Sequence, residues 1–268
     1  MLQYRRSDAP EAMVRATEAY EKKFDIHFHS LLHFSKTTLN RLHCAEEDSN
    51  ALPASVTVAS RSDQSILQEM SALERVANSP APTHMQRERY RAALVSIYQK
   101  LPSPHPGDVS ADAPILRVGV QREGKILGEK LGWLPPDRSL YPDAKRVPFD
   151  GGLIVGISDV SELPPMKSID ACFIIDGAIA SGATTIAIIE ILRYVTSSFH
   201  VFSVHATFEG LRAIARYAEQ AQLDVAVTVG HATAGLNSKF YAIDESADEN
   251  RMVVGDLGDT ISDLDCEG

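Results

Sequence analysis

One stretch, Cys172–Val195, constrains the fold of this chain more than any other. It begins with a short apolar run, Cys172 to Ile175, which is typical of a buried parallel strand and is followed by an acid, Asp176. From Ile186 onward, apolar residues recur at helical spacing. The pattern therefore predicts a strand and a helix joined by a loop of small residues, Gly177 to Thr185.

The composition of this loop suits the binding of a monophosphate. Small residues let backbone N–H groups approach a ligand closely, and the start of a helix adds a partial positive charge. Ser181, Thr184 and Thr185 add hydroxyl donors. The carboxylate of Asp176 is a natural partner for the hydroxyls of a sugar attached to the phosphate. The same pattern also fits an ordinary strand–turn–helix unit whose small residues only permit close packing, and both interpretations remain open.

The segment from Asp176 to Thr184 resembles the loop of type I phosphoribosyltransferases that binds phosphoribosyl pyrophosphate (PRPP). It is most similar to uracil phosphoribosyltransferase, whose loop has the sequence Asp-Pro-Met-Leu-Ala-Thr-Gly-Gly-Ser/Thr, with Gly177 in place of the proline. The resemblance implies that Asp176 holds the ribose hydroxyls and that the loop holds the 5′-phosphate. The residues that it assigns to PRPP binding here are Asp176, Gly177, Ala178, Ile179, Ala180, Ser181, Gly182, Ala183 and Thr184.

A second similarity lies in the strand predicted at Ile115–Val120, whose sequence Ile-Leu-Arg-Val-Gly-Val resembles the family's Ile-Leu-Arg-Ala-Gly-Leu. In the family this arginine contacts the pyrophosphate of PRPP, which implies a catalytic role for Arg117 beside Asp176. A guanidinium in an apolar strand is costly to bury without an anionic partner, and its planar fork suits phosphate oxygens. A structural salt bridge is the alternative role for Arg117.

Two motifs near the C-terminus resemble the family's acceptor-binding segment. Residues 235–242, Gly-Leu-Asn-Ser-Lys-Phe-Tyr-Ala, are similar to Gly-Leu-Asn-x-x-Gly-Tyr-Ile, and residues 255–259, Gly-Asp-Leu-Gly-Asp, to Gly-Asp-Ala-Gly-Asp. The resemblance implies that Asp256 contacts PRPP and that the acceptor is bordered by Ala242, Gly255 and Leu257. Phe240 and Val253 stand where the family has glycine, which indicates an altered base pocket.

The chain also departs from the family in the flexible arm expected within Gly132–Asp150. The family's arm carries a second arginine in a Tyr-Arg-Asp-Glu-like motif, whereas Tyr141 is followed here by proline and aspartate. Arg138, Lys145 and Arg146 are the candidates to replace that arginine.

The segments after the loop alternate regularly. We expect a strand at Val201–Val204, a helix at Phe208–Gln220 and a strand at Val225–Val229, which is the pattern of βαβ units. His205 and His231 are each expected to follow a strand end, where ligands of such sheets lie. With the resemblance, this predicts an α/β fold like that of type I phosphoribosyltransferases, a mostly parallel twisted sheet flanked by helices.

Residues 1–113 are expected to form a mainly helical extension packed on a core of residues 114–268. Helices are predicted at residues 8–24, with Asp8 as N-cap, and at residues 63–77 and 85–100. For residues 24–43 we expect a packed amphipathic helix. The alternative there is a metal site, because His29 and His33 would share one helix face.

Composition limits the classes of partner. The chain has 26 Lys and Arg against 36 Asp and Glu in 268 residues, a net charge of −10, which argues against a broad nucleic-acid or anionic-membrane surface. No apolar run reaches membrane-spanning length and no secretory signal follows the N-terminus, so we expect a cytoplasmic protein. The cysteines, Cys44, Cys172 and Cys266, lack metal-site spacing, and Cys172 is expected to be a buried thiol.

Three functions remain as hypotheses. The first is transfer of the 5-phosphoribosyl group of PRPP to a nitrogenous base, uracil-like or unusual, with release of pyrophosphate. The resemblance implies Mg²⁺ held mainly through PRPP, no metal ligands from the protein, and a homodimer. The second is a non-catalytic PRPP- or nucleotide-binding regulatory protein of the same fold, and the third is a generic α/β enzyme that binds a sugar phosphate.

Overall fold

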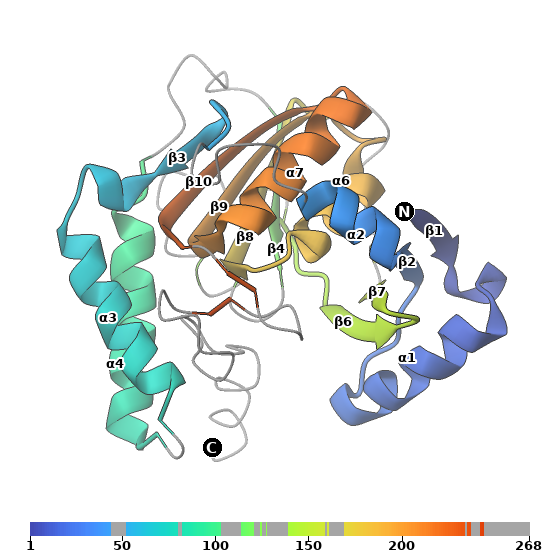
Figure 1. Cartoon of the computed structure of the whole chain (residues 1–268), viewed down its shortest axis with the longest axis horizontal. Coiled ribbons are helices and arrows are strands. Elements are labelled where there is room, and N and C mark those ends of the chain that lie inside the picture. Colours follow the sequence, from blue (N-terminus) through green and yellow to red (C-terminus); the bar gives the residue numbers. More distant parts are fainter. Residues whose placement is uncertain are drawn as a thin grey trace.

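A parallel six-stranded sheet forms the centre of the computed structural model (Figure 1), which describes residues 1–43, 52–79, 82–102, 114–120, 124, 127, 139–158, 160, 169–233, 235–236 and 242–243. All five neighbouring pairs of strands in this main sheet are parallel. The prediction of an α/β fold with a parallel sheet flanked by helices is therefore confirmed. The strand order is β3 (Val56–Val58), β10 (Asp224–Thr233), β9 (Ser198–Thr207), β8 (Ala171–Ile179), β4 (Ile115–Gly119) and β5 (Ser139–Leu140).

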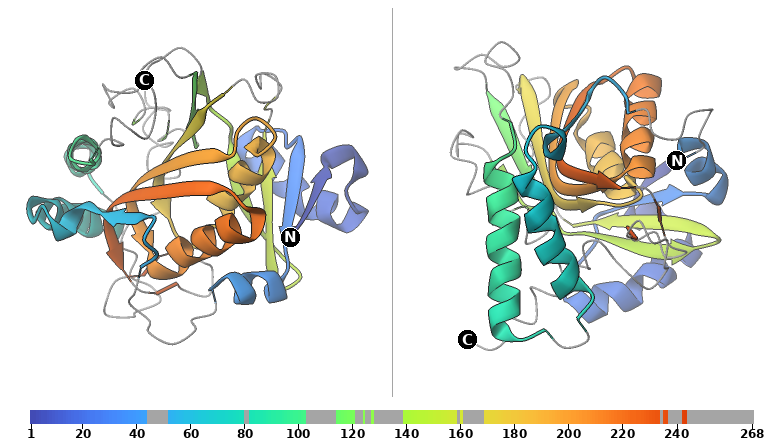
Figure 2. Two further views of the ribbon diagram at one scale, coloured as in Figure 1. Left: turned by 90° about the horizontal axis from the view of Figure 1, so that it is seen from above. Right: turned by 60° about the vertical axis from the view of Figure 1, so that its left-hand side comes forward.

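Helices cover both faces of the main sheet (Figure 2). On one face lie α6 (Ala183–Leu192) and α7 (Phe208–Ala221), and on the other α3 (Ser65–Ala77) and α4 (His84–Gln99). The two faces alternate along each strand, as the pleat requires: Ile174 packs with the α6–α7 side and Phe173 with the α3–α4 side. The apolar run of β8 is therefore buried from both sides.

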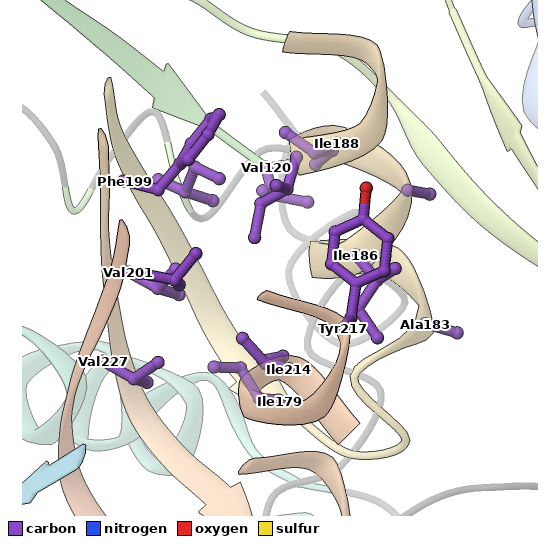
Figure 3. Packing of buried hydrophobic residues seen from close by; sticks show 14 of the residues in the cluster. Val120, Ile179, Ala183, Ile186, Ile188, Phe199, Val201, Ile214, Tyr217 and Val227 are labelled. Atoms are coloured by element: carbon purple, nitrogen blue, oxygen red, sulfur yellow. The ribbon is translucent and has the colours of Figure 1, made fainter. Parts of the chain in front are cut away.

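Helix α6 is apolar around almost its whole circumference. Nine of its ten residues are buried, because the helix lies between the main sheet and a second sheet. Figure 3 shows the core that it closes, in which Ile186 and Ile188 of α6 and Ile214 and Tyr217 of α7 lie beside Phe199, Val201 and Val227 of the sheet.

The second sheet, here called the side sheet, is antiparallel and has the order β1 (Leu2–Arg5), β2 (Ser30–Phe34), β7 (Gly152–Ile157) and β6 (Ala144–Phe149). Its outer face is covered by α1 (Glu11–Phe24), and this contact buries Met13, Leu31 and Ile154. The opposite face contributes Leu32 and Val155 to the core that contains α6. The side sheet is thus joined to the main sheet through one continuous core.

The N-terminal third contributes strands to both sheets. β1 and β2 belong to the side sheet, β3 lies at the edge of the main sheet, and α2 (Lys36–His43) packs on α7 (Figure 1). The boundary near residue 113 stays a prediction, but elements from residues 1–113 and from residues 114–268 are hydrogen-bonded to each other in each sheet.

The predictions for residues 8–43 need correction. A single helix over residues 24–43 is wrong, because residues 30–34 pair with β1 and β7 as a strand, and a helix begins only at Lys36. His33 lies in that strand. Among the residues that the structure describes, no three His, Cys, Asp or Glu side chains are grouped to hold a metal ion. The N-cap of α1 is Pro10, with Asp8 in the preceding 3₁₀ turn.

Other predicted elements appear close to their expected positions, including α3, α4, α7 and the strand at Ile115–Val120. The stretch Gly132–Asp150, predicted to be irregular, contains the strands β5 and β6. β9 and β10 are longer than predicted, so His205 and His231 lie within these strands and not after them.

Cys172 has no exposed surface, and its burial raises the pKa of the thiol, which confirms the predicted buried thiol. None of the helices in the described ranges is long and apolar enough to cross a membrane.

Candidate functional site

The strand order places the topological switch point of the main sheet between β4 and β8. From β8 the chain continues through α6 to β9 and through α7 to β10, whereas β5 lies on the other side of β4. The order reverses between β4 and β8, and open α/β sheets bind ligands beyond the carboxyl ends of the strands at such a switch point. The N–H of Val120 donates to the carbonyl of Ile175 at 2.8 Å and so joins β4 and β8 at this end of the sheet. Asp176 is the next residue.

The loop after β8 is shorter than predicted. β8 continues to Ile179 and α6 begins at Ala183, so only Ala180–Gly182 form the loop, and the predicted bounds Gly177 to Thr185 are wrong. The strand extends because Ala178 and Ile179 still pair with β9, which satisfies their backbone groups. The helix starts early because Gly182, with a φ of +73°, turns the chain in the left-handed region.

The loop is held from behind by α7 and α2. The hydroxyl of Thr207 donates to the carbonyl of Ala180 at 2.6 Å, and Nε2 of His43 lies 2.8 Å from the carbonyl oxygen of Ser181. A Cβ on Gly182 would lie only 2.8 Å from the carbonyl oxygen of Gly210, so the loop passes directly over the start of α7. The close packing considered as the alternative role of these small residues is therefore present.

The three hydroxyls predicted to face a phosphate have different environments. Ser181 is 2% exposed, and its Oγ accepts a hydrogen bond from the N–H of Ala183 at 3.3 Å, which secures the first turn of α6. Thr185 is buried as well. Thr184 is partly exposed, as is Ala180. Of the predicted hydroxyl donors, Thr184 is the one at the surface of the loop.

Asp176 is a partly exposed carboxyl group with an unusual proton affinity. Desolvation by the surrounding protein atoms raises its pKa to about 7. Hydrogen bonds from the backbone N–H groups of Ala178 and Gly177, and the positive charge of Arg146, act in the opposite direction. A carboxyl with a pKa near neutrality at the switch point of a sheet is a feature of functional sites.

The cation that acts on Asp176 comes from the side sheet. Arg146 in β6 pairs with Val155, so its side chain lies on the face that turns toward the main sheet. Lys145 lies on the opposite face, with Nζ 4.3 Å from the centre of the Phe24 ring. Of the two predicted replacements for the family's second arginine that the structure describes, Arg146 is the one that acts on Asp176, and Arg138 lies outside the described residues.

Arg117 lies well before the carboxyl end of the sheet at which Asp176 is found. It pairs with Phe173, three residues before Asp176, which puts it about 10 Å away along the strand and on the other face of the sheet. Arg117 is 7% exposed, and its guanidinium donates to Ser139 Oγ at 2.9 Å and to the Tyr141 hydroxyl at 3.1 Å. The structure therefore does not bring these two side chains together, and the catalytic role of Arg117 stays a prediction.

The two histidines of β9 and β10 belong to a polar cluster, in which His205 is buried and His231 is partly exposed. Nε2 of His205 lies 3.0 Å from Thr233 Oγ1, and Nδ1 of His231 lies 2.9 Å from Ser60 Oγ. Complete burial lowers the pKa of His205 to about 3, with a smaller effect of His231, so its imidazole is neutral. His205 therefore has no exposed surface for a ligand.

Part of the predicted acceptor site is described. Leu236 and Ala242 form an isolated antiparallel bridge, and the N–H of Gly235 donates to Glu209 in the first turn of α7 at 3.3 Å. Ala242 is therefore held near the carboxyl edge of the main sheet, next to β10. Asp256, Gly255 and Leu257 lie outside the described residues.

Solved phosphoribosyltransferases are among the structures similar to this chain. The orotate phosphoribosyltransferase of Mycobacterium tuberculosis H37Rv, solved with PRPP, is 12% identical with a TM-score of 0.36, over 65% of this chain and 94% of that one. The adenine phosphoribosyltransferase of Trypanosoma brucei, with AMP, pyrophosphate and ribose-5-phosphate, is 13% identical with a TM-score of 0.39, over 62% and 79%. The adenine phosphoribosyltransferase of Rhodothermus marinus is 15% identical with a TM-score of 0.39, over 62% of this chain and 99% of that one.

No protein-family model matches the chain, and no curated protein is significantly similar to it in sequence. The structure therefore defines this chain as an α/β protein with a parallel sheet. This assignment is based on the strand order of the chain itself.

Proposed function

We propose that this protein is a PRPP-dependent phosphoribosyltransferase that transfers the 5-phosphoribosyl group to a nitrogenous base, uracil-like or modified, and releases pyrophosphate. One observation carries the proposal: Asp176 lies at the switch point of the main sheet, four residues before a tight loop that opens α6. A carboxylate and a helix N-terminus at this spacing suit the two ends of a ribose 5-phosphate.

Each group in this region has a role in the proposal. The carboxylate of Asp176 accepts hydrogen bonds from the ribose hydroxyls. The backbone N–H groups of Ser181 and Gly182 and the hydroxyl of Thr184 bind the 5′-phosphate. Arg146 supplies positive charge for the pyrophosphate, and Arg117, through Ser139 and Tyr141, fixes the edge formed by β4 and β5 beside it.

The proposed reaction needs positioning more than a protein nucleophile. A ring nitrogen of the acceptor forms a bond to C1 of the ribose while the bond from C1 to the pyrophosphate oxygen breaks, and the proton of the nitrogen passes to solvent. The transition state has oxocarbenium character, so the protein aligns two reactants and stabilises the departing negative charge. Asp176, held by two backbone N–H groups, fixes the ribose for this displacement.

Mg²⁺ would neutralise the departing pyrophosphate. In this proposal the metal is held mainly by the oxygens of PRPP, with no ligand from the protein. A homodimer and a cytoplasmic location are also part of the proposal.

The proposal is tested by incubating the protein with PRPP, Mg²⁺ and a panel of nitrogenous bases, and measuring pyrophosphate release. We expect turnover of at least one base, and we expect Asp176→Asn to lower kcat/KM at least about 100-fold, because the ribose loses its carboxylate partner. PRPP binding without turnover of any base would favour the regulatory alternative. Absence of PRPP binding would contradict both.

Neighbouring residues of β6 supply a matched pair for the role of Arg146. Arg146→Gln is expected to weaken PRPP binding about tenfold, because one charge-assisted contact is lost. Lys145→Gln removes the same charge one residue away, on the face that lies against Phe24, and is expected to leave binding within twofold of the wild type. Equal losses in the two variants would show that Arg146 acts only through the net charge of the protein.

A further inference from the structure

The contact between His43 and the phosphate loop joins two distant parts of the chain. His43 is the last residue of α2, and its Nε2 lies 2.8 Å from the carbonyl oxygen of Ser181, 138 residues away in the sequence. A carbonyl oxygen only accepts hydrogen bonds, so Nε2 carries the proton and donates it. We infer that His43 is a positioning residue that orients the loop for the 5′-phosphate, an inference that rests on the proposed function.

The position of His43 is fixed by the packing of α2. Leu39 and Leu42 of this helix are buried in the main core. Nη1 of Arg216, in α7, donates to the carbonyls of Arg41 and Leu42 at 3.1 and 3.3 Å, and so caps the last turn of α2. α2 and α7 are thus packed and hydrogen-bonded to each other, and His43 contacts the loop from the end of α2.

Two donors on this support hold two successive carbonyls of the loop. Thr207, the N-cap of α7, donates to Ala180, and His43 donates to Ser181. In a trans peptide the C=O of one residue and the N–H of the next point in opposite directions. The N–H groups of Ser181 and Gly182 are therefore turned away from α7 and α2.

This orientation presents backbone donors where the proposed ligand requires them. The side chain of Ser181 is used within the protein, because it accepts from the N–H of Ala183. The N–H groups of Ser181 and Gly182 therefore carry the binding of a phosphomonoester, together with the start of α6. Without His43, the peptide between Ser181 and Gly182 loses the hydrogen bond that fixes its plane. Phosphate binding then has to order this peptide, at a cost in conformational entropy.

The test compares three variants by titration calorimetry with ribose 5-phosphate as the probe. His43→Phe keeps a ring of similar size without the donor, and is expected to raise the Kd about tenfold. His43→Gln places an amide N–H at a similar reach, and is expected to restore the Kd to within about twofold to threefold of the wild type. His84→Phe, at the exposed start of α4, is the control and is expected to leave the Kd unchanged.

The outcomes separate this inference from the proposed function. If the wild type binds ribose 5-phosphate and His43→Phe binds it equally well, or His43→Gln is as weak as His43→Phe, the inference is overturned and the proposed function stands. If the wild type binds neither ribose 5-phosphate nor PRPP, both are overturned. Thermal unfolding shows whether each variant is folded, and His43→Ala replaces His43→Phe in the comparison if the latter is not.

Discussion

At the scale of single residues, two titratable groups with shifted pKa values act on stability in opposite directions. Burial raises the pKa of Asp176 from 3.8 to about 7, and it lowers the pKa of His205 from 6.5 to about 3. Between about pH 4 and pH 7 the folded protein binds a proton at Asp176 that the unfolded chain has released. Over the pH range from about 6.5 down to 3, the unfolded chain binds a proton at His205 that the folded protein does not.

The signs follow from proton linkage. The contribution of Asp176 to the free energy of unfolding falls as the pH rises from about 4 to 7, whereas that of His205 falls as the pH drops below about 6.5. Because the two effects offset each other, these two groups together are expected to make the free energy of unfolding of the wild type depend only weakly on pH in this range.

Replacing Asp176 by Asn is expected to separate the two effects. The variant should gain stability relative to the wild type as the pH rises from 5 to 8, by on the order of 2 kcal/mol, because it no longer carries a carboxylate in a poorly solvated position. Urea unfolding at pH 5, 6, 7 and 8 measures this difference. A difference between the two proteins that stays constant across these pH values would show that the pKa of Asp176 is not raised.

At the scale of elements, the turn between β8 and α6 is decided by the helix behind it. Gly182 has a φ of +73°, and the carbonyl of Gly210 in α7 lies where a Cβ would project. Both the strand end and the helix start are therefore fixed by a close backbone contact, which explains why the loop has only three residues.

Gly182→Ala is expected to lower the free energy of unfolding by about 2–4 kcal/mol, from left-handed strain of about 1 kcal/mol and from displacement of the loop or α7. Gly151→Ala is the matched control. Its φ is +68°, but the new Cβ would meet only the Lys36 side chain at 3.8 Å, so it should cost about 1 kcal/mol. Chemical denaturation of both variants measures the difference. Equal losses would mean that Gly182 is required for its φ alone.

At the scale of the whole molecule, the N-terminal third is part of the fold and not an addition to it. β3 pairs with β10 in the main sheet, and β2 pairs with β7 in the side sheet. α3 and α4 cover one face of the main sheet, where Phe173 and Phe202 are buried against them. Removal of this third would therefore expose a whole face of the sheet.

A fragment of residues 114–268 is accordingly expected not to fold on its own. It would expose the apolar face that α3 and α4 cover and leave β7 without its partner β2, so we expect aggregation or a state without fixed packing. Near-UV circular dichroism and size-exclusion chromatography test this against the full chain. A monomeric fragment with a cooperative thermal transition would show that the predicted boundary near residue 113 separates independent domains.

Local patterns determined which class of fold this chain adopts. The apolar run before Asp176, the helical spacing after it and the alternation of strands and helices up to residue 229 are properties of neighbouring residues, and the structure confirms them. Asp176 and the small-residue segment could be identified as a candidate site for the same reason, since strand, acid and loop are contiguous. The length of the loop was overestimated because its end depends on pairing with β9 and contact with Gly210.

Tertiary structure alone decided which distant groups meet at the site. Nothing around His43 marks it as a partner of Ser181, and Arg146 could not be chosen over Lys145 until the pairing of β6 with β7 fixed which of them faces the main sheet. The strand at Ser30–Phe34 was missed because its partners are distant in sequence. The register of β4 against β8, which separates Arg117 from Asp176, could not be predicted because the sequence of neither strand determines it. The physical reason is common to these cases: periodicity is a short-range property, whereas register, strand order and close backbone contacts arise when segments far apart in the chain compete for the same buried space.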